Sequence, residues 1–122
     1  MGSDFMFEKA KDLSGVSFPC EYGEFEMDSQ TFPWEILRNH LIQNGARKNF
    51  NSDSLIWEIE DKGHIYITGT DTYVSLDMHA DWSILLELFS WINNKDKFVV
   101  LAEMSEGLYY DPLSFKNFIQ PC

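Results

Sequence analysis

The titratable side chains of this sequence gather between residues 55 and 79, where alternating apolar and polar residues predict three strands. Successive side chains point to opposite faces of a strand, so one face should carry the polar set. Its members are Glu58, Glu60, His64, Tyr66, Tyr73, Ser75, Asp77 and His79. We predict that His64 lies between Glu60 and Asp77, whose charges would favour the protonated imidazole. A carboxylate-flanked histidine can act as a general acid or base, so these three are the candidate catalytic residues.

The same face is also a candidate binding surface. The candidate binding residues are Glu58, Glu60, Tyr66 and His79, and the alternative is a solvated strand face with ordinary charge pairs. Asp77, His79 and Asp81 are metal-ligand types at alternating positions, but no second ligand cluster follows them and Asp81 suits a helix cap. We therefore predict neither a metal site nor a cofactor.

Recognised catalytic motifs are missing from the sequence. It has no GxSxG elbow, phosphate-binding loop or GxGxxG turn. The two cysteines, Cys20 and Cys122, form no CxxC pair, and Cys20 has no basic neighbour that would activate its thiol. These observations favour a binding protein over an enzyme.

The strands that hold the polar face are predicted at residues 55–60, 64–70 and 73–79, joined as a meander by turns rich in Asp, Gly and Thr. Placing Glu60 opposite His64 puts the apolar residues of all three strands on the other face. The cross-strand pairs expected in that register are Ile59 with Ile65, Trp57 with Ile67, Leu55 with Gly69, Ile67 with Val74 and Ile65 with Leu76.

One helix is predicted before this meander in the sequence and one after it. The first runs from Thr31, a capping residue, to Asn44 and ends before Gly45. The second runs from Trp82 to Asn93 behind the cap Asp81, with apolar residues at helical spacing. A strand buried on both faces follows at 98–102, then a short strand at 108–110 and a short helix after Pro112.

The first thirty residues carry the weakest pattern. We expect residues 1–12 to be an added leader or a flexible segment, with Met6 as an alternative start, and a short strand near Glu24 to Met27. The predicted fold is a single α+β domain over residues 1–122. Its mostly antiparallel sheet would have about 4–6 strands, a three-strand meander plus a C-terminal strand, with two main helices packed on it.

Charge limits the partners of the protein. Asp and Glu number 20 against 9 Lys and Arg, for a net charge of -11, which repels nucleic acids and anionic membranes and favours a basic protein partner. The carboxylates most open to such a partner are Glu58, Glu60, Asp61, Asp71 and Asp77. No apolar run approaches a membrane span or a secretory signal, so we expect a cytoplasmic protein.

The order of two strands, a helix at 82–92 and a further strand, with the ending Tyr109-Tyr110-Asp111-Pro112, resembles small acidic α+β proteins among bacterial toxin-immunity proteins and orphan integron-cassette proteins of mobile elements. The resemblance implies an accessory protein that binds a basic partner such as a nuclease toxin. Two alternatives are a small-ligand or enzymatic domain using Glu60, His64 and Asp77, and an oligomeric structural protein, such as a homodimer, that buries Leu88, Trp91 or the C-terminal aromatic residues.

Overall fold

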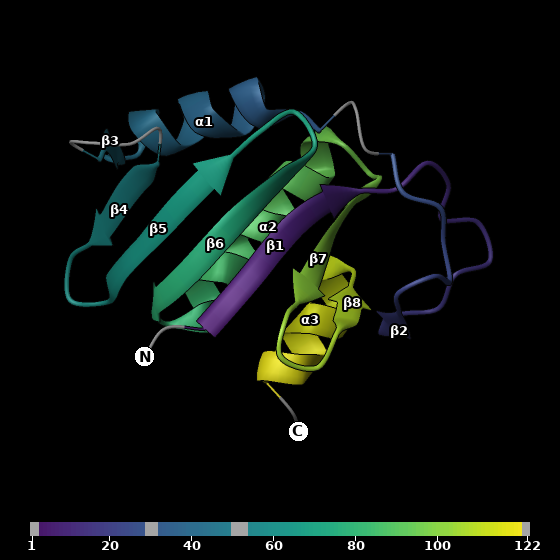
Figure 1. Cartoon of the computed structure of the whole chain (residues 1–122). Coiled ribbons are helices and arrows are strands. Elements are labelled where there is room, and N and C mark those ends of the chain that lie inside the picture. Colours follow the sequence, from purple (N-terminus) through teal and green to yellow (C-terminus); the bar gives the residue numbers. More distant parts are fainter. Residues whose placement is uncertain (1–2, 29–31, 50–53, 121–122) are drawn as a thin grey trace.

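A computed structural model describes residues 3–28, 32–49 and 54–120, and within these ranges it has eight strands and three helices (Figure 1). The strands are β1 (Ser3–Lys9), β2 (Cys20–Glu21), β3 (Arg47–Lys48), β4 (Leu55–Ile59), β5 (Gly63–Gly69), β6 (Tyr73–Ala80), β7 (Val99–Glu103) and β8 (Leu108–Tyr110). The helices are α1 (Trp34–Gln43), α2 (Trp82–Lys95) and α3 (Pro112–Ile119).

All strands belong to one open sheet with the order β2-β8-β7-β1-β6-β5-β4-β3, and every pairing is antiparallel. The α+β class and the antiparallel sheet are confirmed. The sheet is larger than predicted because β1 and the two-residue strands β2 and β3 join it, and α3 is the short helix predicted after Pro112.

Residues 3–9, part of the segment 1–12 that was expected to be an added leader or flexible, form the regular strand β1. It lies in the middle of the sheet, between β6 and β7, and pairs with both. Phe5 and Phe7 are 1% and 0% exposed, whereas Asp4, Met6 and Glu8 point to the opposite face. Apart from Met6, apolar and polar residues alternate from Asp4 to Glu8, which is a strand pattern, and Phe5 and Phe7 pack in the core.

The first meander turn differs from the prediction by two residues. Glu58, and not Glu60, lies opposite His64, and Ile59 pairs with Gly63. Gly63 has φ of 107°, and a Cβ there would come 2.1 Å from the backbone oxygen of His79, so only glycine fits this first paired position. Gly63 is thus the first residue of β5 and not part of the turn, so the register differs by two residues from the prediction. A shift of two residues leaves each side chain on its predicted face of the sheet.

The second turn is also displaced by two residues. Ile67 pairs with Leu76 and Ile65 with Met78, not with Val74 and Leu76 as predicted. The reason is the hydroxyl of Thr70, which accepts hydrogen bonds from the backbone N–H groups of residues 72 and 73 and places the two-residue loop at 71–72.

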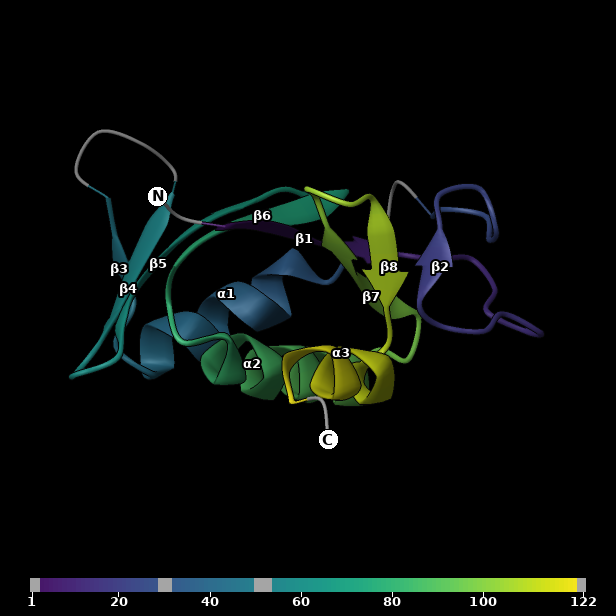
Figure 2. The ribbon, with the colours of Figure 1, turned by 90° about the horizontal axis from the view of Figure 1, so that it is seen from below.

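The three helices cover one face of the sheet (Figure 2). Leu37 and Leu41 of α1 are fully buried; the helix starts at Trp34, later than predicted, and Thr31 lies outside the described residues. Asp81 caps α2 as predicted, accepting from the N–H of Ser83 at 2.9 Å. No helix in the described ranges has the length and apolar character of a membrane span.

The segment between β1 and α1 covers part of the other face. Leu13, Val16, Phe18 and Phe25 pack on a small second core over β7 and β8 made by Cys20, Val100, Ala102 and Tyr109. All five residues of β7 are therefore buried, as predicted for a strand covered on both faces, but the strand begins at Val99, and Phe98, the first residue predicted for it, is 40% exposed. Residues 24–27 are not the predicted strand: they contribute one bridge, from Met27 to Ala10, and the strand of this segment is β2.

Candidate functional site

The helices leave one face of the sheet open (Figure 2), and the predicted polar residues of β4, β5 and β6 alternate with the buried apolar residues and so lie on that face. Their closest grouping is on β5 and β6, where His64 lies opposite His79. The two imidazoles stack with centroids 4.8 Å apart and planes at 15°, and the Tyr66 ring meets both edge-on at 5.1 and 5.8 Å. Asp77 Oδ2 is 3.2 Å from Nε2 of His79. The structure thus brings four of the predicted residues together.

Glu60 is separated from this grouping. It lies in the turn after β4, so the prediction that it faces His64 is wrong. Glu58 takes that position, but its Oε1 is bound by Nη2 of Arg47 at 2.8 Å. Asp77 contacts His79 rather than His64. Neither Glu60 nor Asp77 therefore flanks His64 as predicted.

The imidazole grouping lies on an open strand surface. None of the three cavities described below is lined by His64 or His79. Among the residues that the structure describes, no three His, Cys, Asp or Glu side chains are arranged to hold a metal ion. Without a cavity to exclude water, these side chains have little means to orient a substrate, and their catalytic role stays a prediction.

A cavity of about 520 Å³ lies at the end of the sheet where β1 and α2 begin and β7 ends. Its lining residues are Asp4, Trp82, Glu103, Met104, Ser105, Glu106 and Phe118. Three of them are acidic and none is basic. Trp82 and Phe118 stack with centroids 5.9 Å apart and planes at 18°, so the cavity joins carboxylates to an aromatic wall. We call this cavity the acidic pocket.

Glu103 is the most buried acid of the acidic pocket, with 6% of its surface exposed. Burial alone would raise its pKa, but hydrogen bonds from Ser105 and Glu106 outweigh burial and hold the pKa below its ordinary value. Oε1 accepts from Ser105 N and Oγ at 2.8 and 2.6 Å, and Oε2 accepts from Glu106 N at 3.0 Å. Glu103 is therefore a fixed negative charge that also shapes the turn.

Asp4 strengthens the negative field beside this pocket. It pairs directly with Asp77 across β1 and β6, on the open face. Two like charges in directly opposed positions destabilise a sheet. The placement of Asp4 opposite Asp77 therefore indicates that the negative charge serves a function and does not stabilise the sheet.

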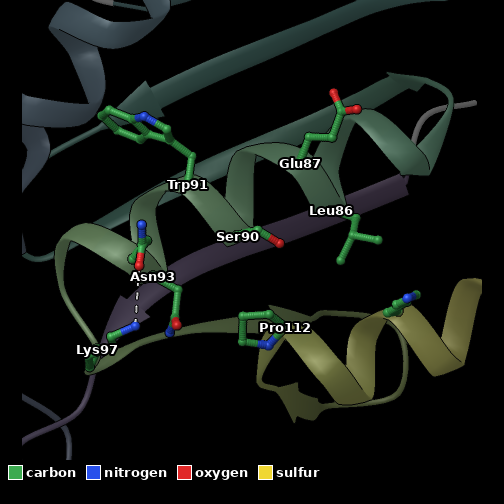
Figure 3. Close-up of a pocket in the computed structure, with 9 residues that line it drawn as sticks. Leu86, Glu87, Ser90, Trp91, Asn93, Lys97 and Pro112 are labelled. Atoms are coloured by element: carbon green, nitrogen blue, oxygen red, sulfur yellow. Dashed lines mark hydrogen bonds between the residues drawn. The ribbon is translucent and has the colours of Figure 1, made fainter.

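A larger cavity, of about 700 Å³, lies on the far side of the helices between α2 and α3 (Figure 3). It is lined by Leu86, Glu87, Ser90, Trp91, Asn93, Asn94, Lys97, Pro112 and Lys116. Its polar groups serve the fold, because Asn93 donates to the Val99 carbonyl at 3.0 Å and Lys97 to Asn94 at 3.4 Å. Charges of both signs and the absence of a convergent polar group make it the weaker binding candidate.

The helix residues predicted for a dimer are explained within one chain. Leu88 is 3% exposed and belongs to the main core. The Trp91 ring stacks on His40 with centroids 3.6 Å apart, and Nζ of Lys95 lies 5.4 Å from its centroid. Burial, followed by the charge of Lys95, lowers the pKa of His40.

A third cavity, of about 340 Å³, lies on the open side of β1 where the segment after β2 passes over it. Glu8, Tyr22, Met27, Asp28, Thr72 and Tyr73 line it. Burial raises the pKa of Glu8, while its hydrogen bond with the Tyr109 hydroxyl lowers it in part. Burial, then Glu8, raises the pKa of Tyr109.

Sequence reasoning missed Asp4 and Glu8, the two acids that β1 contributes to these cavities. Their alternation with Phe5 and Phe7 would have identified a strand with an acidic outer face. The cysteines gave no such signal: Cys20 is a buried free thiol, and Cys122 lies outside the described residues.

Comparison with known proteins places no relative beside this geometry. No family model, curated protein or solved structure matches the chain.

Proposed function

We propose that the protein is a protein-binding accessory protein of the immunity type, which recognises a basic partner through the acidic pocket. The observation that carries this proposal is the lining of that pocket: three carboxylates and two stacked aromatic rings, with no basic residue. A lysine or arginine side chain is the protein group that fits both features, because carboxylates pair with its charge and aromatic faces attract cations.

The surroundings of the pocket fit a protein interface. Met104 and Phe118 expose 49% and 38% of their surface beside the carboxylates. Aromatic residues and methionine are enriched in interfaces, and a ring filling a desolvated pocket is a common source of binding energy. The exposed apolar surface and the charge therefore favour the same kind of partner.

The field around the pocket extends to the neighbouring turn. Glu60 and Asp61 are exposed in the β4–β5 turn, and the carbonyl of Lys62 in that turn accepts from Asp81 N at the start of α2. With a net charge of -11, such a surface would speed encounter with a basic protein. A nuclease is one partner of this chemistry, because its substrate site must attract phosphate.

Short peptides test the charge preference. Tetra-arginine, tetra-lysine and tetra-glutamate would be titrated into the protein while the indole N–H of Trp82 is followed by NMR. We expect both basic peptides to shift this signal and the acidic peptide to leave it unchanged. Affinity should fall as salt rises from low to physiological concentration, since exposed charge pairs are screened. Binding that ignores ionic strength contradicts the proposal.

A matched pair of variants separates the pocket from the overall charge. Asp4→Asn with Glu106→Gln removes two charges from the pocket, and Glu35→Gln with Glu87→Gln removes two from exposed helix positions. We expect the first pair to weaken the basic peptides by about threefold or more and the second to have a smaller effect. Equal losses would mean that the peptides respond to net charge alone.

A further inference from the structure

The cavity beside Glu8 is a second site, distinct from the acidic pocket. Asp4 and Glu8 share the open face of β1 but are four residues apart, which places them about 13 Å from each other along the strand. The cavity lies between β1, the start of β6 and the segment after β2, which is held by the hydrogen bond from Asp28 N to the Lys9 carbonyl at 2.7 Å. These elements make a pocket out of an otherwise open strand face.

Glu8 has an incomplete set of hydrogen bonds. Its Oε2 is buried and has no hydrogen-bond partner, although the Tyr109 hydroxyl bonds the same side chain. A buried acceptor without a donor is costly, and such atoms are rare in folded proteins. Glu8 also lines a cavity, so a ligand there that reaches its carboxylate can supply the missing donor.

The other lining residues define the charge of that ligand. Asp28 brings a second carboxylate, and Tyr22 and Tyr73 bring aromatic rings. Tyr22 is 77% exposed and Tyr73 is 39% exposed. Met27 adds an apolar contact and Thr72 a hydroxyl. Carboxylates and aromatic faces both favour a cation, and no lining residue is basic.

We propose that this cavity binds a small organic ammonium compound whose charged nitrogen donates a hydrogen bond to Oε2 of Glu8 and whose apolar part packs between Tyr22 and Tyr73. An ammonium group supplies both the donor and the countercharge, whereas a neutral donor supplies only the first. A volume of about 340 Å³ suits one ring with a short chain. The ligand class is therefore an arylalkylamine or a compact alkylamine.

Three probes of similar shape test the charge requirement: 2-phenylethylamine, 2-phenylethanol and phenylacetate. Binding would be measured by NMR titration, following the signals of Tyr73 and Tyr109. We expect the amine to saturate the site and to bind at least about tenfold tighter than the alcohol, as for a hydrogen bond between charged groups. Phenylacetate should not bind. Equal binding of amine and alcohol, or no binding of the amine at millimolar concentration, would overturn the proposal.

Variants assign the amine to Glu8. Glu8→Gln keeps the shape and an acceptor for Tyr109 but removes the charge, and Glu21→Gln is a control with the same change in net charge at an exposed residue next to Tyr22. We expect the affinity for 2-phenylethylamine to fall at least about tenfold in the first variant and to change less than twofold in the second. A Tyr22→Ala variant removes an exposed wall of the cavity and should weaken the amine severalfold. Unchanged affinity in Glu8→Gln would refute the site, whatever the acidic pocket does with basic peptides.

Discussion

Gly69 should not tolerate even one added methyl group, because α1 lies directly on it. A Cβ at this position would come 2.3 Å from Cε3 and 2.4 Å from Cδ2 of the Trp34 ring. Carbon atoms in contact are normally about 3.5–4.0 Å apart, so the ring would have to move by more than about 1 Å. Trp34 packs against the main core, which resists that movement.

The Gly69→Ala variant is expected to lower the free energy of unfolding by about 1–3 kcal/mol, the usual cost of overpacking. For a chain of 122 residues this corresponds to a fall in Tm of about 4–12 °C. The sign is informative, because alanine is otherwise more stable than glycine in a strand by about 0.5–1 kcal/mol. Only the Trp34 contact makes the substitution unfavourable.

A double-mutant cycle isolates that contact. The free energy of unfolding would be measured by urea denaturation for the wild type, Gly69→Ala, Trp34→Leu and the double variant. In the Trp34→Leu background, Gly69→Ala should become neutral or stabilising. If Gly69→Ala does not destabilise the wild type, or costs as much without Trp34, then Trp34 does not lie over Gly69 and the placement of α1 is wrong.

Three further predictions concern titration and capping. Burial raises the folded-state pKa of Glu8, so the stability of the wild type should fall as pH rises from 4.5 through that pKa. Glu8→Gln removes this loss and should therefore raise Tm near neutral pH. Melting curves from pH 4 to 8 test this, and they should show no gain in Tm at the acid end. The lowered pKa of His40 means that the folded state disfavours the imidazolium, so the wild type should lose stability as pH falls below 6.5. His40→Phe keeps a ring on Trp91 and should make this acid-side loss smaller. Urea midpoints measured over a pH series test this. Asp111→Ala removes the side chain that accepts from Ser114 N at 2.9 Å and should cost about 1 kcal/mol in urea unfolding, with no loss contradicting the cap.

The meander and α2 could be predicted because their signals are local. Alternation at 55–79 assigned Ile65, Ile67, Val74 and Leu76 to the core, and all four are fully buried. Register could not be predicted in the same way, because it depends on turn details. A shift of two residues keeps every side chain on its face, so the hydrophobic pattern cannot detect it.

The candidate sites were less predictable than the fold, because they form from residues far apart in sequence. Glu8 shares its cavity with Tyr22, Met27 and Asp28 from later in the chain, and its partner Tyr109 comes from β8. The acidic pocket joins the start of β1 to α2 and α3. Local patterns show that a residue is acidic, but only tertiary pairing shows which acids share a cavity.

Strand β1 links these observations, because it joins two parts of the sheet that are otherwise separate. The meander β4–β5–β6 and the hairpin β7–β8 are each built from chain neighbours, and β1 pairs with β6 on one side and β7 on the other. Its inner face supplies Phe5 and Phe7 to the core, and its outer face supplies Asp4 and Glu8 to the two cavities. The contacts that complete the sheet are therefore the same contacts that assemble both proposed sites, so neither site can form before β1 has entered the sheet.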